Sequence, residues 1–412
     1  MAKIETGLGT RLDRAVESLD SFYKKRTLRW LTSLYDSECG GFYYSESAKK
    51  YEGFLPDVES TLQAVNLLFD GAVKGVKGEI PENMKCEMGK FVLSLRDSDG
   101  FFYHPQWGKD ISESRRSCDK SCATSLMDKL GVSVDPEKKT ESKSAPSPKK
   151  SDSAEKSASE HLTDATSLGK YLDSLVSSDA QTVADKIKGE YKDIKEASLT
   201  SELFDYLDSL SERFDSRYWN ETAESALAAW IYRIGSLYND EGRRIVGAYD
   251  LVKRCTSLIL KKNKTECIMQ IHSVWAALAT LLKNVTATYE HGAREIYSCF
   301  SYVRALAPEM IRITIGKMRA FKKLSGGYSY YKGYSPAYAH GTHVALGVDE
   351  GDMNATVIAV YGIRSSIFTS VGLSVAPIWE KDELTRLLSE KKRKAVKRPV
   401  PARFESDPKI KK

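Results

Sequence analysis

One arrangement of residues occurs three times in this 412-residue chain. Each copy is a cluster of glycine and aromatic residues, followed after a polar stretch by an aspartate that opens an apolar run. The clusters occupy residues 40–44, 99–104 and 326–331, and the aspartates are Asp57, Asp119 and Asp352. Recurrence of this kind indicates one supersecondary unit that is used repeatedly.

Each unit is predicted to be a helix, a glycine loop and a second helix. Apolar helical segments precede the glycines at residues 27–34, 88–95 and 315–324. A glycine after the last periodic residue ends a helix, because it adopts the left-handed conformation without steric cost. The aspartate then suits the N-cap of the next helix. Since two helices alone cannot bury their apolar faces, such units must stack or close into a ring.

This pattern resembles the repeat of the terpenoid cyclase and protein prenyltransferase superfamily, whose fold is an α/α toroid. The resemblance lies in residues 31–68, 91–126 and 321–359. It implies outer helices that run into a glycine-aromatic turn, and inner helices whose starts rim a central cavity. The chain has no Asp-x-Asp-Asp run of the class II cyclases, and the zinc set of the prenyltransferases has no match at corresponding positions.

The spacing of the copies predicts the number of units. Gly41 and Gly100 are 59 residues apart, and the 227 residues from Gly100 to Gly327 are just under four more such intervals. Strand-like alternation is scarce. We therefore predict an all-α fold, an α/α toroid of about six helical hairpins. Amphipathic stretches fill the middle intervals at residues 199–214, 221–237, 247–260, 267–282 and 293–306.

Two segments are predicted to be disordered, and they divide the chain. Residues 134–160 are built almost wholly from Lys, Ser, Glu, Asp, Pro and Ala, too polar to order themselves. Residues 386–412 form a basic tail, and residues 1–133 and 161–385 form the predicted toroid. The tail carries the basic excess of a chain whose net charge is +6. The tail suits weak contact with nucleic acid or an anionic surface; in the alternative it is only a solvated terminus.

The sequence predicts a cytoplasmic protein without a membrane span. No apolar leader follows Met1, and no window of 18 apolar residues occurs. The seven cysteines are scattered and odd in number, as is typical of reduced thiols. Cys118 and Cys122 fall on one helix face, but a zinc site there needs two more ligands, and none is obvious nearby. We therefore predict no metal and no cofactor.

The stretch 101–108 and the residues after it combine a phenol, an imidazole, an indole and two guanidiniums. Histidine acts as a general base, tyrosine as a proton donor and arginine as an anion clamp. We predict Tyr103 and His104 as catalytic residues. A buried aromatic loop with surface arginines explains the same residues structurally. The predicted substrate contacts here are Trp107, Arg115, Arg116 and Asp119.

A second cluster, at residues 330–354, places His340 and His343 beside three acidic residues. It suits a metal site or acid/base chemistry, and we predict His340 and Asp352 as catalytic residues. In the alternative, Asp352 only caps a helix. Glu59 is a further candidate, whose alternative role is to complement a helix dipole. The remaining predicted substrate contacts are Tyr43, Tyr44, Tyr330, Tyr331, Glu350 and Asn354.

Three functions remain open at this point. Tyrosine and tryptophan faces suit sugars, where paired carboxylates would hydrolyse a glycosidic bond and Tyr, His and Arg would eliminate across a uronic acid. Aromatic faces also suit the carbocations of isoprenoid diphosphate chemistry. The third function is a non-catalytic binding module. We expect the first: an enzyme, a glycoside hydrolase or a polysaccharide or oligosaccharide lyase, acting on an oligosaccharide or related small molecule. A polar, Tyr-rich cavity would favour sugars, and a Phe/Leu/Val-lined one isoprenoids.

Overall fold

The computed structural model describes residues 2–74, 80–132, 160–175, 180–213, 223–288 and 292–389. The fold is mostly helical, which confirms the all-α prediction. The predicted insertion lies outside these ranges except for its last residue, which begins the 3-10 turn η3 (Glu160–Leu162). Of the predicted tail, residues 386–389 belong to helix α15 (Lys381–Ser389), and the rest lies outside the described residues.

Helices account for all five amphipathic stretches predicted in the middle of the chain. The strands that the structure describes form two pairs: β1 (Val73–Lys74) is parallel to β4 (Trp379–Glu380), and β2 (Tyr338–Ala339) is antiparallel to β3 (Thr342–His343). Two helical segments, η1 (Leu68–Ala72) and η4 (Ile358–Ile363), are π-helical. The other helices are α1 (Ala2–Ser33), α2 (Glu46–Lys50), α3 (Val58–Leu67), α4 (Glu82–Ser94), α5 (Glu113–Leu130), α6 (Ala165–Leu175), α7 (Ala180–Glu196), α8 (Thr200–Arg213), α9 (Ala223–Asp240), α10 (Ala248–Leu260), α11 (Ile268–Ala287), α12 (Ala293–Met318), α13 (Met353–Val357) and α14 (Arg364–Ser370).

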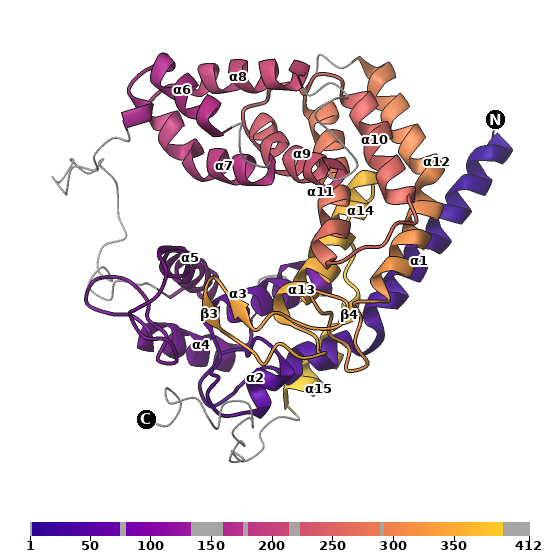
Figure 1. The fold of residues 1–412 in the computed structure, drawn as a ribbon. Helices are drawn as coiled ribbons and strands as arrows, with labels where there is room; N and C mark the ends of the chain where they lie inside the picture. Colours follow the sequence, from indigo (N-terminus) through magenta and orange to yellow (C-terminus); the bar gives the residue numbers. More distant parts are fainter. Residues whose placement is uncertain are drawn as a thin grey trace, which may run out of the picture.

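The helices follow one another in two series. In one series α5 packs on α3, α3 on α13, η4 on α11, α11 on α9 and α9 on α7. In the other, α1 packs on α12 and α12 on α10. Figure 1 shows the first series as an arc whose opposite ends are α5 and α7. No described helix is long and apolar enough to cross a membrane.

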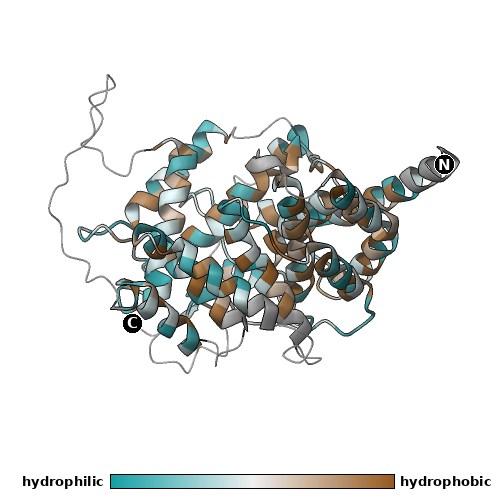
Figure 2. Cartoon of the chain, turned by 90° about the horizontal axis from the view of Figure 1, so that it is seen from above, coloured by the Kyte–Doolittle hydropathy of each residue, from teal (hydrophilic) through white to brown (hydrophobic). Residues whose placement is uncertain are grey.

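Apolar faces of these helices meet in two cores. The larger core runs through most of the molecule, and the smaller one lies among α6, α7, α8 and α9. Hydrophobic and hydrophilic residues alternate along the helices in Figure 2, as burial of one helix face requires. The seven cysteines are free thiols, as predicted.

The N-cap prediction is confirmed for two aspartates and wrong for the third. Asp57 caps α3 by accepting from the backbone N–H of Ser60, and Asp352 caps α13 by accepting from that of Ala355. Asp119 instead lies inside α5, because the Ser112 hydroxyl caps that helix nearly two turns earlier. The glycine loop of the second copy is therefore followed by a longer helix.

Glycine pairs let two of the loops approach a neighbouring helix closely. A Cβ on Gly40 would collide with the backbone of Glu87 in α4, and one on Gly326 would lie 2.5 Å from the carbonyl oxygen of Arg26 in α1. Both glycines have positive φ, of 85° and 117°. A Cβ on Gly100, in the second copy, would meet no described atom within 4 Å. Its loop therefore needs glycine only for the turn.

Candidate functional site

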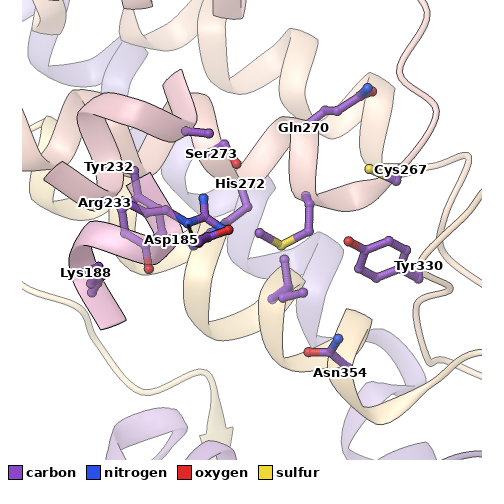
Figure 3. A pocket seen from close by; sticks show the side chains of 13 residues that line it. Asp185, Lys188, Tyr232, Arg233, Cys267, Gln270, His272, Ser273, Tyr330 and Asn354 are labelled. Atoms are coloured by element: carbon purple, nitrogen blue, oxygen red, sulfur yellow. Dashed lines mark hydrogen bonds and ion pairs between the residues drawn. The ribbon is translucent and has the colours of Figure 1, made fainter. Parts of the chain in front are cut away.

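A cavity of about 820 Å³ opens on the concave side of the first helix series. Figure 3 shows the side chains that line it, contributed by α7, α9, α11, α13 and η4 and by the loop that contains Tyr330. The lining residues are Asp185, Lys188, Ala229, Tyr232, Arg233, Cys267, Met269, Gln270, His272, Ser273, Tyr330, Asn354 and Ile358. Among these described residues there is no Phe, Leu or Val.

His272 lies at the back of this cavity, on α11. Its ring packs edge-on against Tyr232, with centroids 5.3 Å apart and an interplanar angle of 84°. Its Nδ1 is buried and has no hydrogen-bond partner among the described residues. Burial lowers the pKa of His272 to about 4, and the positive charge of Arg233 acts in the same direction. The imidazole is therefore neutral near pH 7, with one of its two ring nitrogens unprotonated.

A cation and an anion face each other beside His272. The Arg233 guanidinium, on α9, forms an ion pair with the exposed Asp185 carboxylate of α7. Figure 3 shows both side chains next to the imidazole, with Lys188 further along α7. Asp185 is the only carboxylate among the described lining residues. Because a guanidinium has five N–H donors, Arg233 retains donors for a bound anion.

Two residues predicted from the sequence line the same cavity, Tyr330 and Asn354. Asn354 is the second residue of α13, and Tyr330 lies in the third glycine-aromatic cluster. The backbone N–H of Tyr330 donates to the Asp352 carboxylate at 2.9 Å, which fixes the loop against the start of α13. Burial raises the pKa of the Tyr330 phenol to about 12. The phenol is therefore a hydrogen-bond donor at neutral pH.

The first predicted cluster is brought together, but away from this cavity. His104 stacks on Trp107 with ring centroids 3.9 Å apart, and its Nε2 lies 2.8 Å from the carbonyl oxygen of Pro56. Arg115 is fully buried, lies 4.9 Å from the Trp107 ring and pairs with Asp119. Burial lowers the pKa of His104 to about 4. These contacts tie α5 to the loop before it.

Tyr103 and Arg116 lie apart from that buried group. The Tyr103 hydroxyl donates to Asp99 at 2.7 Å, and Arg116 lies 5.7 Å from the ring of Phe101. In the other glycine loops, the Tyr43 hydroxyl donates to Asp36 at 2.9 Å. Tyr331 stacks on Tyr334 with centroids 4.7 Å apart.

Asp352 and Glu350 are engaged in a buried hydrogen-bond network. Besides its cap bond, Asp352 accepts from the Ser335 hydroxyl at 2.7 Å and also bonds the Tyr44 side chain. Glu350 accepts from the hydroxyl of Ser45 at 2.9 Å and from the backbone N–H of Ser47 at 2.7 Å. Burial raises the pKa of Asp352 to about 6 despite these bonds. The network joins the first and third glycine loops.

His340 lies at the tip of the β2–β3 hairpin and is exposed. Its Nε2 is 3.7 Å from a carboxylate oxygen of Glu59, and its Nδ1 is 3.2 Å from the hydroxyl of Ser114. The other Glu59 oxygen accepts from Arg115 at 3.0 Å. Histidine and glutamate, far apart in the sequence, thus meet over α5.

Sequence reasoning missed most of the cavity residues, including Tyr232, Arg233 and His272. A signal was present in α11, where Gln270, His272 and Ser273 interrupt the apolar first half of the helix. Comparisons with protein-family models, curated proteins and solved structures find no match to this chain. The function therefore has to be argued from the site itself.

Proposed function

We propose that this chain is an α/α toroid whose cavity binds an acidic carbohydrate and cleaves it by elimination, as a polysaccharide or oligosaccharide lyase does. The two helix series support the toroid, because α10 and α12 of the second series pack on α11 of the first. Contacts between the beginning and the end of the chain support it too, since α3 packs on α13 and α1 on α12. A ring of this kind presents its inner helices to one central cavity.

The hydrogen-bonding side chains in the cavity lining, two tyrosines among them, carry the proposal. Tyr232 and Tyr330 supply flat faces and hydroxyl donors, and Gln270 and Asn354 supply amides. Sugar hydroxyls are bound through such donors and acceptors, whereas an isoprenoid chain gains its affinity from apolar surface. The lining thus favours a sugar over an isoprenoid.

The chemistry of elimination matches the groups beside His272. The C5 proton of a uronic acid is acidic because the adjacent carboxylate stabilises the carbanion, more so when a cation neutralises that carboxylate. In the proposed step Arg233 binds the carboxylate and neutral His272 removes the C5 proton through Nε2, because Nδ1 is buried. The electron pair forms the C4–C5 double bond, the C4–O bond breaks, and a tyrosine hydroxyl protonates the leaving oxygen.

The alternative of glycoside hydrolysis has less support. That reaction uses two carboxyl groups on opposite sides of the scissile bond. The described lining offers only Asp185, which is paired with Arg233. Elimination does not require a pair of carboxyl groups from the protein.

The test is incubation of the purified protein with oligouronates and with neutral oligosaccharides of equal length. A new ultraviolet absorbance from the conjugated double bond is expected with oligouronates only. His272→Ala and Arg233→Met should each reduce the rate at least ~100-fold. Tyr103→Phe, remote from the cavity, is the matched control and should leave it unchanged. Binding of prenyl diphosphates in place of oligouronates, seen as a raised melting temperature, would overturn the proposal.

A further inference from the structure

A second group of chemically distinct side chains lies outside the cavity. The Glu59 carboxylate, the Cys118 thiol and the His340 imidazole each offer one ligand atom, and these atoms all lie within 4.8 Å of one another. They come from the first turn of α3, from the second turn of α5 and from the tip of the β2–β3 hairpin. Figure 1 shows β3 lying against α3 and α5.

The β2–β3 hairpin is anchored so that its histidine faces this group. His340 and Gly341 both have positive φ, of 49° and 81°, as a two-residue hairpin turn requires. The hydroxyl of Ser112, the N-cap of α5, donates to the carbonyl oxygen of His340 at 2.9 Å. The Ser114 hydroxyl lies 3.2 Å from Nδ1, which leaves Nε2 directed at Glu59. An outer hydrogen bond of this type orients metal-binding histidines.

Glu59 is oriented in a similar way. Its Oε2 accepts from Arg115 at 3.0 Å, while its Oε1 lies 3.7 Å from Nε2 of His340. Arg115 also contacts the carboxylates of Asp57 and Asp119. One guanidinium thus faces three carboxylates, and the excess of negative charge attracts a cation.

We propose that Glu59 Oε1, Cys118 Sγ and His340 Nε2 bind a zinc ion, with water as the fourth ligand. A carboxylate, a thiolate and an imidazole together suit zinc better than magnesium or calcium, which prefer oxygen ligands alone. Zinc–ligand bonds of about 2.0–2.3 Å place tetrahedral ligands roughly 3.3–3.8 Å apart. Nitrogen and oxygen ligands have the shorter bonds and lie about 3.3–3.5 Å apart, so Nε2 and Oε1, at 3.7 Å, need to approach by only a few tenths of an ångström. On binding, the Cys118 thiol releases its proton to solvent and the thiolate donates its electron pair to zinc.

Cys122 provides a matched control within the same helix. Its Sγ is 3.9 Å from that of Cys118, and it lies outside the three-residue group. A site made by the two cysteines alone would depend on both thiols. The proposed site depends on Cys118, whereas replacing Cys122 leaves all three ligands in place.

The experiment measures zinc bound per chain after metal removal and titration with zinc, in the full-length protein. Wild type and Cys122→Ser should bind one zinc each, and Cys118→Ser and His340→Ala should bind at least ~10-fold more weakly. Cobalt should give a thiolate-to-metal absorption band in wild type that Cys118→Ser lacks. Circular dichroism checks that each variant is folded.

Two outcomes would overturn the inference. One is wild-type zinc affinity no greater than that of the folded Cys118→Ser/His340→Ala double variant. The other is loss of binding in Cys122→Ser together with full binding in His340→Ala, which would assign the metal to the cysteine pair alone. Neither outcome bears on the proposed lyase, because the cavity at His272 shares none of these residues.

Discussion

The imidazole of His272 lies directly against the backbone of Gly362. A Cβ at position 362 would come 2.7 Å from Cδ2 and 2.8 Å from Nε2 of that ring. Gly362 belongs to the π-helical segment η4, and irregular turns of this type are frequent at functional sites. The absence of a side chain at 362 thus sets where the imidazole lies in the cavity.

Gly362→Ala should therefore displace His272 from its contact with Tyr232. We expect at least a ~10-fold loss of elimination rate, with about 1–2 kcal/mol of lost stability from overpacking. The histidine proton signals in NMR spectra should move, which reports the displacement independently of activity. Gly316→Ala is the control, because a Cβ there meets no described atom within 4 Å. An unchanged His272 signal in Gly362→Ala would contradict the prediction.

Acid should destabilise the protein through His272. The folded-state pKa, about 4, is lower than the ordinary value of 6.5, and Arg233, Asp185 and Tyr232 face the ring. The stabilising contribution is therefore complete above pH 6.5 and is lost as pH falls toward 4, because the unfolded chain takes up a proton that the folded chain resists. The full loss is about 3 kcal/mol. The free energy of unfolding, measured with urea between pH 4 and 6.5, should depend less steeply on pH in His272→Gln than in the wild type. The same pH dependence in both proteins would contradict the assignment to His272.

Gly327→Ala should weaken the contact between the third glycine loop and α1. A Cβ on Gly327 would collide with the indole of Trp30, which is buried in the larger core. We expect a loss of about 2–3 kcal/mol in unfolding free energy. Gly333→Ala, a few residues along the same loop, places its Cβ in open space and should change stability by less than ~0.5 kcal/mol. Equal effects of the two substitutions would contradict the close approach.

Asp352→Ala should lower the stability of the protein by more than the loss of an ordinary helix cap does. The carboxylate accepts from the backbone of Ala355 and Tyr330 and from the Ser335 hydroxyl, so its removal leaves several buried donors unpaired. We expect a loss of about 3–4 kcal/mol. Asp250→Ala, at an exposed position in the first turn of α10, should cost under ~0.5 kcal/mol. Thermal unfolding distinguishes the two, and a mild effect at position 352 would indicate that water replaces the carboxylate.

The repeat predicted the local structure well in the two copies whose aspartates cap a helix. In the first and third copies, the hydroxyl of a threonine four residues after the aspartate accepts a hydrogen bond from the backbone N–H of an aromatic residue. Thr61 accepts from Phe42, and Thr356 accepts from Tyr328. In the second copy Ala123 occupies the corresponding position after Asp119, so the bond cannot form. That difference was visible in the sequence and marks the second copy as the divergent one, whose helix is capped by Ser112 instead.

The residues of the candidate site were harder to predict from the sequence. Tyr330 and Asn354 were predicted because they stand in the third repeat copy, and both line the cavity. Tyr232, Arg233 and His272 lie on α9 and α11, and only the rotation of those helices within the assembly decides that they face inward. Glu59, Cys118 and His340 are separated by up to 281 residues, so their meeting depends on packing between α3, α5 and the β2–β3 hairpin.

Helix α9 divides its apolar residues between two cores: Leu227 and Ile231 belong to the larger, and Trp230 and Ile234 to the smaller. The smaller core is formed by α6, α7 and α8 together with α9. Apart from α9, these helices make few contacts with the larger core. Such a layout favours partial unfolding, in which α6 to α8 open together while the remainder stays native. Amide protons of those three helices should then exchange with solvent as one group, before those of α11 and α12. The Asp185 side of the cavity would open with them, so the cavity could admit a long chain from the side without threading it.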